Sequence, residues 1–275
     1  MAKGTTKSGG NKDVLDRFYT KPEVAEKLLT LIDVNSFEIV VEPSAGAGSF
    51  SNLIPECVAY DISPEHDSIK QADWLTLDKN IFNDKKVLVL GNPPFGTNGN
   101  LAKKFIVESA KFAHTVAFIL PKSFKKISVK NGIPRHLHLV TEEDIAENAF
   151  VFEGAEYSVP CVFQVWESRQ YLRSKVKQAT SSDLIQFVSK EDADFRIQRV
   201  GGNAGKASYD LSRAESSNYF VKNTSGWSND FLISVMNNLE HPYLNDVAGP
   251  RSLSKGELIF ALEEVLGNGA PETRV

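Results

Sequence analysis

The sequence is poor in cysteine, lacks long apolar runs and carries no excess of positive charge. Its two cysteines, Cys57 and Cys161, each lie in an apolar, strand-like run, which favours two buried thiols over a disulfide or a metal site. No run of about 18 apolar residues occurs, so no membrane-spanning helix is expected. The net charge of −4 argues against a histone-like protein that binds nucleic acid by charge alone, but it permits a local basic face.

The N-terminal residues are small, polar and basic and lack an apolar core, which predicts a disordered tail over residues 1–16 rather than a signal peptide. A cytoplasmic protein is therefore expected. The length of 275 residues suggests one large domain, or one domain with a small appendage. The hydrophobic content of 41% and the charged content of 24% are typical of a globular protein with a full core.

Short apolar runs alternate with helical patterns over the first 167 residues. Strands are expected at residues 37–41, 57–60, 86–90, 115–120 and 161–166. Helices are expected at residues 21–31, with Thr20 as a candidate N-cap, and at residues 100–112, and a glycine loop that enters a helix is expected at residues 46–53. This alternation indicates an α/β domain with a doubly wound, parallel sheet covered by helices on both faces.

In such folds, ligands bind at the carboxyl ends of the strands, where Glu42, Asp61 and Asn92 are expected to lie. After residue 167 the pattern becomes more polar and less regular, so residues 17–167 are predicted to form the main domain and residues 168–275 a small C-terminal region. Two helices are expected in that region, at residues 230–239 with Ser228 or Asn229 as the cap, and at residues 255–266 with Ser254 as the cap.

The loop Gly91-Asn92-Pro93-Pro94-Phe95-Gly96 directly follows a buried strand. Each proline fixes φ and removes a backbone donor, so the loop presents carbonyl oxygens and the Asn92 side chain. Such a loop can accept hydrogen bonds from an exocyclic amine, while an aromatic ring covers the group that bears the amine. A purely structural turn is the less favoured interpretation.

Three further features precede this loop. The run Val40-Val41-Glu42-Pro43-Ser44-Ala45-Gly46-Ala47-Gly48-Ser49-Phe50 carries a glycine turn after a strand, but it lacks the third glycine of a dinucleotide fingerprint and the Gly-Lys-Ser/Thr of a phosphate loop. A tight connection explains this turn equally well. Asp61 could bind ribose hydroxyls, or it could stabilise a turn before Ser63-Pro64. Asp73 could accept a hydrogen bond from an adenine amine, with Trp74 as an apolar wall, or it could be an exposed acid in a turn.

Taken together, Glu-Pro-x-x-Gly-x-Gly, two aspartates and Asn-Pro-Pro-Phe, in this order and each after a strand, resemble the class I S-adenosylmethionine-dependent amino-methyltransferases, most closely the N6-adenine group. The upstream Arg17-Phe18-Tyr19-Thr20-Lys21-Pro22 resembles the N-terminal cofactor motif of that group. The resemblance covers about residues 17–166. It implies a Rossmann-like, mostly parallel, seven-stranded sheet and a C-terminal region that recognises the substrate or nucleic acid.

The resemblance also implies the cofactor, S-adenosyl-L-methionine, and the residues that hold it. Glu42 and the backbone of residues 45–48 would hold the methionine end, Asp61 the ribose and Asp73 the adenine amine. The predicted cofactor-binding set is Phe18, Tyr19, Thr20, Glu42, Pro43, Ser44, Ala45, Gly46, Gly48, Asp61, Ile62, Asp73, Trp74 and Asn92.

The catalytic residues implied by the resemblance are Asn92, Pro93, Pro94 and Phe95. The Asn92 side-chain oxygen and the Pro93 carbonyl would accept the two protons of the target amine, and Phe95 would stack on a flipped base. No metal is required. Many DNA enzymes of the group carry Asp at the position of Asn92, but Asn is also common.

A basic stretch follows the strand at residues 115–120 and is expected at the same sheet edge as Asn92. The residues predicted to contact nucleic acid are Lys122, Lys125, Lys126, Lys130 and Arg135. A solvated loop explains them equally well.

Three substrates follow from the resemblance. The leading hypothesis is methylation of the adenine N6 amine in DNA, with the base flipped into the loop. RNA, including ribosomal RNA, is the closest alternative, because Phe95 followed by Gly96-Thr97 also resembles RNA adenine methyltransferases. A protein glutamine methyltransferase is third, since that family usually shows Tyr where Phe95 stands.

Overall fold

The computed structural model describes residues 18–241, 244–247 and 249–267. The tail expected over residues 1–16 lies outside the described residues. Contacts divide the chain into two units. The first unit consists of Met1–Pro121 and Ile133–Arg173, and the second consists of Lys122–Gly132 and Ser174–Val275. In the described part, no helix is both long and apolar enough to cross a membrane.

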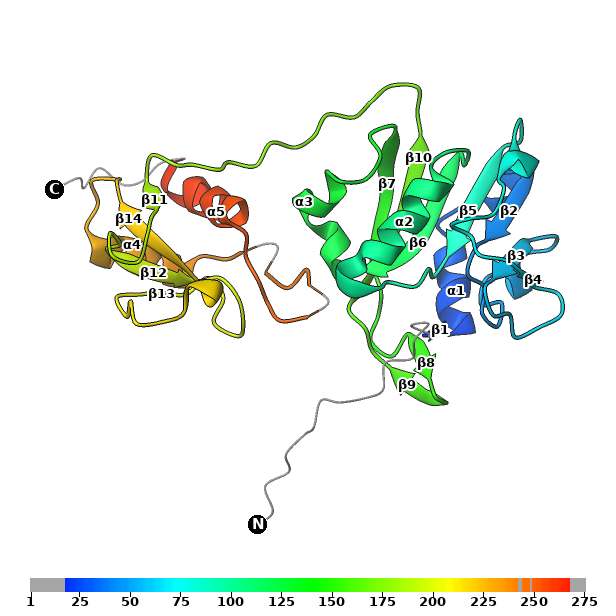
Figure 1. Ribbon diagram of the computed structural model, residues 1–275, viewed down its shortest axis with the longest axis horizontal. Helices are drawn as coiled ribbons and strands as arrows, with labels where there is room; N and C mark the ends of the chain where they lie inside the picture. Colours follow the sequence, from blue (N-terminus) through cyan, green and yellow to red (C-terminus); the bar gives the residue numbers. More distant parts are fainter. Residues whose placement is uncertain (1–17, 242–243, 248, 268–275) are drawn as a thin grey trace, which may run out of the picture. The chain divides into compact units, whose positions relative to one another are not determined.

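The first unit is built on a seven-stranded sheet (Figure 1). In spatial order the strands are β4 (Lys70–Gln71), β3 (Val58–Asp61), β2 (Ile39–Glu42), β5 (Val87–Gly91), β6 (Thr115–Pro121), β10 (Cys161–Ser168) and β7 (Leu137–Asp144). The first five are parallel, and β10 runs antiparallel to both of its neighbours. The predicted α/β fold with a mostly parallel sheet of seven strands is confirmed.

The strand order reverses between β2 and β5. From β2 the chain adds β3 and β4 on one side, and it then returns to add β5 and β6 on the other side. Val40 pairs with Leu88 and Val41 with Val89, so these two strands end side by side. Such a switch point opens a crevice at the carboxyl ends of the strands, here at Glu42 and Gly91.

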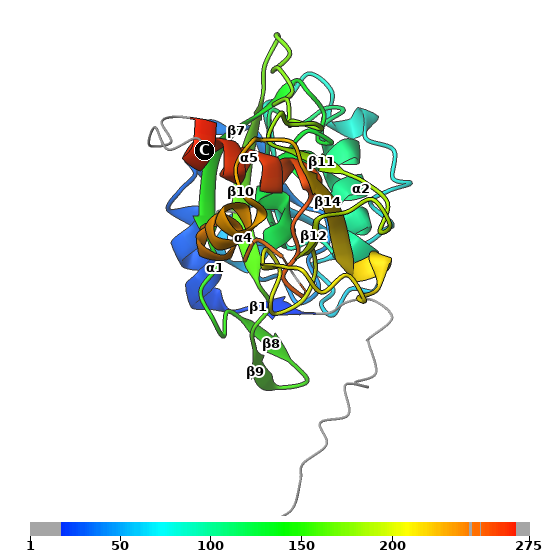
Figure 2. The same ribbon diagram turned by 90° about the vertical axis from the view of Figure 1, so that its left-hand side faces the viewer.

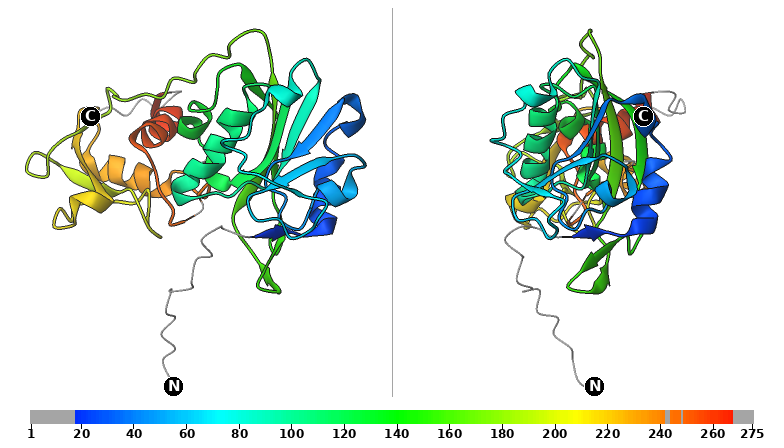
Figure 3. Two further views of the ribbon diagram at one scale, coloured as in Figure 1. Left: turned by 45° about the vertical axis from the view of Figure 1, so that its right-hand side comes forward. Right: turned by 90° about the vertical axis from the view of Figure 1, so that its right-hand side faces the viewer.

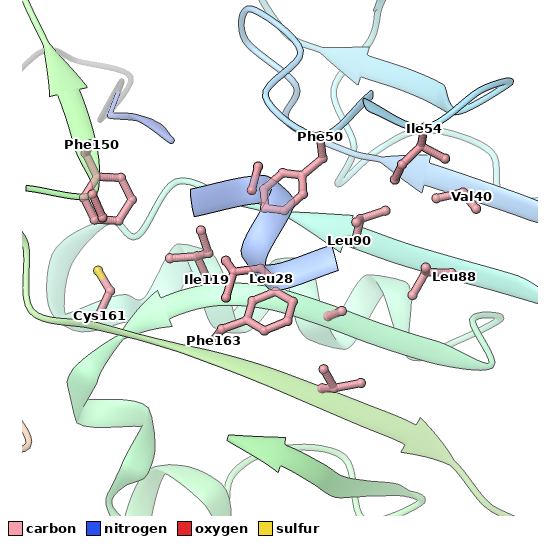
Figure 4. Close-up of a cluster of buried hydrophobic side chains, with 14 residues drawn as sticks. Leu28, Val40, Phe50, Ile54, Leu88, Leu90, Ile119, Phe150, Cys161 and Phe163 are labelled. Atoms are coloured by element: carbon pink, nitrogen blue, oxygen red, sulfur yellow. The ribbon is translucent and has the colours of Figure 1, made fainter. Parts of the chain in front are cut away.

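Helices α1 (Pro22–Leu29) and α2 (Asn100–Ser109) cover opposite faces of the sheet (Figure 3). Successive residues of a strand point to opposite faces, and Leu88 and Leu90 of β5 face α1. They pack with Leu28 and Phe163 in a buried cluster (Figure 4). This cluster fixes the two central strands that end at the crevice.

Three local predictions for the first unit were incomplete. Helix α1 begins at Pro22 after Lys21, and the Thr20 side chain does not cap it. The glycine loop leads only into a short 3₁₀ turn, Ser51–Leu53, because Pro55 follows closely and holds Ile54 in an extended conformation. Strand β7 was not predicted, since its exposed sheet edge carries acidic residues in place of an apolar run.

A second, small sheet ties the N-terminal segment to the rest of the first unit. It contains β1 (Tyr19–Thr20), β8 (Phe150–Phe152) and β9 (Ala155–Tyr157), with β8 in the middle. Lys21 extends it, because its backbone N–H donates to the Ala149 carbonyl at 3.0 Å and its ammonium pairs with Glu156.

Cys57 and Cys161 are both free thiols. Burial raises the pKa of Cys57 to about 12 and that of Cys161 still further. Both side chains contribute to the apolar cluster beneath α1, but Cys57 is half-buried, so the prediction of two buried thiols holds in full for Cys161 alone.

The second unit contains a four-stranded antiparallel sheet and helices α4 and α5 (Figure 2). Its elements are α3 (Ile127–Lys130), β11 (Ile185–Phe187), β12 (Phe195–Gln198), β13 (Ala207–Ser208), β14 (Asn218–Asn223), α4 (Asn229–Asn238) and α5 (Lys255–Gly267). Phe195, Val221 and Leu258 are fully buried in its core. The four strands were not predicted, and the region is more regular than the sequence indicated.

The two predicted helix caps of the second unit are present. Ser228 accepts a hydrogen bond from the Phe231 amide at 3.2 Å. Ser254 accepts from the Glu257 amide at 3.2 Å, and the Glu257 carboxylate accepts from the Ser254 amide at 2.8 Å. This reciprocal pair is a capping box, which satisfies two backbone donors at the start of α5.

The boundary between the two units lies after Arg173, whereas the sequence predicted a boundary after residue 167. Residues 169–173 stay with the first unit, because the amides of Arg169 and Arg173 donate to the carbonyls of His136 and Arg135. Residues 122–132 lie between two strands of the first unit in sequence but belong to the second unit.

Candidate cofactor and target-amine site

A cavity of about 290 Å³ lies at the carboxyl ends of β2, β3 and β5. Every residue predicted to bind the cofactor lines it, except Gly48. Pro94 of the predicted catalytic set also lines it. The sequence reasoning missed Ser49, Ser63, Glu65, Ala72, Leu75, Leu101 and Phe105. Leu101 and Phe105 are one helical turn apart on α2, a spacing that could have placed them on one face.

The charges on the cavity wall are all of one sign. Its lining contains four acidic residues, Glu42, Asp61, Glu65 and Asp73, and no lysine or arginine. A phosphate-rich ligand would meet no countercharge in this lining. A ligand that carries a sulfonium and an ammonium group, as S-adenosylmethionine does, is favoured by the negative field.

Glu42 is buried, with 1% of its surface exposed, and its carboxylate fixes the turn that follows the glycine loop. Its oxygens accept hydrogen bonds from the amides of Phe50, at 3.3 Å, and Ser51, at 2.7 Å. Burial raises the pKa of Glu42 to about 7, and the negative charge of Asp61 adds to the effect, although these two amides oppose it. The side chain therefore changes charge near neutral pH.

Asp61 braces the glycine loop at the end of β3. One carboxylate oxygen accepts from the Gly46 amide and the other from the Ser63 amide, both at 2.8 Å. Each carboxylate oxygen has a second lone pair, so Asp61 can still accept two hydroxyl protons. Gly46 has a φ of +54°, and a Cβ there would lie 3.1 Å from the Tyr19 ring, so this position suits glycine alone.

Asp73 lies half-buried in a turn after β4, and one of its oxygens accepts from the Leu75 amide at 2.9 Å. Its other oxygen has no hydrogen-bond partner in the described part of the chain, so it can accept a proton from a ligand amine. Trp74 is only 1% exposed, and its indole N–H donates to Ser109 at 3.3 Å. The Trp74 ring thus serves mainly the core, although the residue borders the cavity.

Two side chains border the ligand space from outside the acidic set. Tyr19 lies over Gly46, and its hydroxyl donates to the Glu65 carboxylate. Ile62 lines the cavity beside Asp61 and is 55% exposed, which leaves apolar surface that a planar ring could cover.

Asn92 lies half-buried at the end of β5, where it lines the cavity. Its side-chain nitrogen donates to the Phe18 carbonyl at 3.0 Å and to the Thr20 hydroxyl at 3.3 Å. Its side-chain oxygen accepts no hydrogen bond from any described residue. The Asn92 backbone carbonyl accepts from the Ser44 hydroxyl at 3.3 Å. The loop therefore offers the cavity an unused amide oxygen.

The rest of the loop is divided between the cavity and the core. Pro93 is buried and does not line the cavity, and Phe95 is half-buried against the apolar cluster beneath α1. Gly96 follows with a φ of +64°, and a Cβ there would lie 2.7 Å from Leu101. The predicted stacking of Phe95 on a base stays a prediction.

The basic residues predicted to contact nucleic acid belong to two different units. Arg135 belongs to the first unit, is exposed, and donates from Nε to the Arg173 carbonyl at 2.9 Å. The four lysines belong to the second unit. Lys126 donates to the Ser252 carbonyl at 2.9 Å and pairs with buried Glu257 at 3.4 Å. Its ammonium is committed inside the second unit, which corrects the prediction for this residue.

Comparisons with known proteins bear on the first unit. Residues 34–159 match the EDM2 methyltransferase-like domain family. Over 132 residues the chain is 26% identical to protein ENHANCED DOWNY MILDEW 2 of Arabidopsis thaliana, a stretch that covers 42% of this chain and 10% of that protein. The chain thus spans about a tenth of the length of this curated relative.

Solved structures give more distant likenesses. A protein of Pyrococcus horikoshii assigned as an RNA methyltransferase has a TM-score of 0.45 and 16% identity, covering 58% of this chain and 91% of its own. The 23S rRNA methyltransferase ErmE has a TM-score of 0.41 and 15% identity, covering 57% of this chain and 71% of its own. Both TM-scores lie below 0.5, so neither likeness identifies a substrate.

The family match begins just before β2 and ends just before β10, so it includes the switch point and most of the cavity lining. This segment is therefore similar to a methyltransferase-like domain.

Proposed function

We propose that this protein transfers a methyl group from S-adenosylmethionine to the N6 amine of adenine in DNA. The observation that carries the proposal is the Asn92 amide, whose nitrogen is held by Phe18 and Thr20 while its oxygen is left for a ligand. An oxygen in that position can accept a proton from an exocyclic amine at the end of β5. The cavity beside it suits the cofactor in charge, because its lining carries acidic residues and no lysine or arginine.

Different residues of the cavity would bind different parts of the cofactor. Asp61 would accept the ribose hydroxyls with its remaining lone pairs, and the free oxygen of Asp73 would accept the adenine amine. Ile62 would cover one face of the adenine ring. The glycine loop, held by Glu42 and Asp61, would approach the methionine end closely.

When bound, S-adenosylmethionine supplies an electrophilic methyl group on its sulfonium. Asn92 would hold the target amine by one proton, which draws the nitrogen lone pair out of conjugation with the ring. The resemblance assigns the second proton to the Pro93 carbonyl; Pro93 is buried and does not line the cavity, so this role stays a prediction. The acidic wall would favour the positive charge that develops on the amine, so positioning and electrostatics supply most of the rate. No side chain has to remove a proton before transfer.

DNA is the proposed polymer because the Arg17–Pro22 segment precedes the glycine loop and a C-terminal region follows, an order similar to that of the N6-adenine enzymes whose target-recognition region is C-terminal. The Asn92–Phe95 loop itself does not distinguish DNA from RNA. A base within a duplex has to be flipped out to reach such a site. Arg135 on the first unit and Lys122, Lys125 and Lys130 on the second are the basic residues proposed to hold phosphates.

The test is to incubate the purified protein with methyl-labelled S-adenosylmethionine and separate pools of DNA, RNA and protein, and then to identify the modified residue by mass spectrometry. We expect N6-methyldeoxyadenosine from DNA. N6-methyladenosine from RNA would transfer the proposal to the RNA alternative, and methylglutamine would support the protein alternative. Absence of label from all three pools would contradict the proposed activity.

Replacement of Asn92 tests the residue on which the proposal rests. Asn92→Ala should abolish detectable transfer, while cofactor affinity, measured by isothermal titration calorimetry, should stay within a few fold. Asn35→Ala is the matched control, because Asn35 is an exposed asparagine of the same unit and does not line the cavity. Loss of both activities in Asn92→Ala would mean that Asn92 is needed for the fold rather than for the amine.

A further inference from the structure

The amide of Asn92 has a defined orientation, and the N-terminal strand sets it. The two protons on Nδ2 are both used, one by the Phe18 carbonyl at 3.0 Å and one by the Thr20 hydroxyl at 3.3 Å. A carbonyl oxygen can accept but cannot donate. The nitrogen of the amide must therefore face Phe18, and the oxygen must lie on the opposite side of the group.

The two acceptors sit on a segment that is braced from several directions. Thr20 is 4% exposed and pairs with Phe150, and Tyr19 pairs with Val151. The Phe18 ring stacks on Tyr157 with centroids 5.1 Å apart and an interplanar angle of 12°. Because the segment is fixed by β8 and β9, its carbonyl and hydroxyl are preorganised to receive the Asn92 protons.

We infer that Thr20 is a positioning residue for Asn92, and that the Phe18 carbonyl and the Thr20 hydroxyl together select an amide over a carboxylate at position 92. A carboxylate there would turn one oxygen toward the Phe18 carbonyl, so that two acceptors face each other without a proton. The Thr20 hydroxyl can rotate to donate, but the carbonyl cannot. The consequence for turnover rests on the proposed function, whereas the orientation of the amide does not.

The orientation can be observed without an enzymatic assay. The full-length protein is labelled with ¹⁵N at asparagine side chains, and Asn92→Ala identifies the Asn92 signal in a ¹H–¹⁵N spectrum. Thr20→Val removes the hydroxyl and keeps the side-chain shape, whereas Thr20→Ser keeps the hydroxyl. We expect Thr20→Val to move one of the two Hδ2 signals of Asn92 upfield and to speed its exchange with water several fold. Thr20→Ser should leave both signals in place.

Kinetics then test the positioning role. Thr20→Val should lower kcat about tenfold, the size expected for loss of one neutral hydrogen bond. Thr20→Ser should stay within threefold of the parent protein, and kcat is measured at saturating S-adenosylmethionine because Thr20 also lines the cofactor cavity. An equal fall of kcat in the two variants would overturn the role of the hydroxyl.

Asn92→Asp is an independent test, because it leaves β1 intact. A carboxylate can accept an amine proton as well as an amide can, yet we expect kcat to fall at least tenfold because the Phe18 carbonyl disfavours it. Full activity of Asn92→Asp, or unchanged Asn92 signals in Thr20→Val, would overturn the inference. If the Asn92 signals respond as expected but the parent protein methylates no substrate, the orientation stands and the proposed function fails.

Discussion

Replacing Glu42 by Gln should change the pH dependence of the stability of the first unit. The Glu42 carboxyl titrates near 4.5 when unfolded and near 7 in the folded protein. Between these pH values the folded state binds more protons than the unfolded state, so raising the pH lowers the free energy of unfolding. Gln does not titrate, and Glu42→Gln therefore lacks this contribution.

The size of the effect follows from the two pKa values. From pH 5 to pH 8 the Glu42 contribution falls by about 2.5 kcal/mol, at about 1.4 kcal/mol for each pH unit of separation. The Gln side chain can accept from the Ser51 amide but would present its own N–H to the Phe50 amide, which costs about 1 to 3 kcal/mol. Glu42→Gln should thus be less stable than the parent protein at pH 5 and nearly equal to it at pH 8.

The assay is urea unfolding of both proteins at pH 5, 6, 7 and 8, without cofactor, read from the exchange of backbone amides in peptides that contain β2 and β5. These peptides report the first unit alone. The difference between the two proteins cancels every other titrating group. A difference that stays constant from pH 5 to pH 8 would refute the elevated pKa of the buried Glu42 carboxyl.

Two further changes probe other parts of the molecule. Asp61→Asn should weaken S-adenosylmethionine binding tenfold to a hundredfold in calorimetry, because one of the Gly46 and Ser63 amides would face an amide N–H, and unchanged affinity would contradict the bracing role of Asp61. Asp67→Asn, at an exposed acid near the same turn, is its control. Lys126→Met should destabilise the second unit by about 3 to 5 kcal/mol in urea unfolding followed by amide exchange in α5, because Glu257 is left buried without its partner. Combining Lys126→Met with Glu257→Gln should restore most of the lost stability. If Lys126→Met instead had normal stability but bound polynucleotides more weakly, Lys126 would be a nucleic-acid contact as first predicted.

Much of the site could be predicted because its residues follow strands. Asp61 and Asn92 come directly after apolar runs, and parallel strands end at one edge of a sheet. Asp73 was not placed by such a run, because the preceding strand β4 consists of the exposed, polar residues Lys70 and Gln71, and its assignment came from the resemblance. What these residues bind within the protein could not be predicted, because the hydrogen bonds of Asp61 to Gly46 and of Asn92 to Thr20 depend on how loops fold back.

The failures have identifiable causes. Lys126 looked like part of a basic surface because its partner, Glu257, is far away in sequence. The helix expected after the glycine loop was predicted from the glycine turn that follows a strand, and it is cut short because Pro55 holds Ile54 in an extended conformation. Thr20 has the chemistry of a helix cap, but its hydroxyl accepts from Asn92 instead.

The placement of residues 122–132 in the second unit has a consequence for synthesis and for dissection of the chain. This segment leaves the ribosome long before α5. The ion pair between Lys126 and Glu257 therefore forms only after β7 and β10 have been synthesised and can complete the first sheet. A protein cut after Arg173 would also keep the segment but lose every other part of the unit to which it belongs. Separation of the two units therefore requires two excisions, with the 122–132 loop replaced by a short linker between β6 and β7.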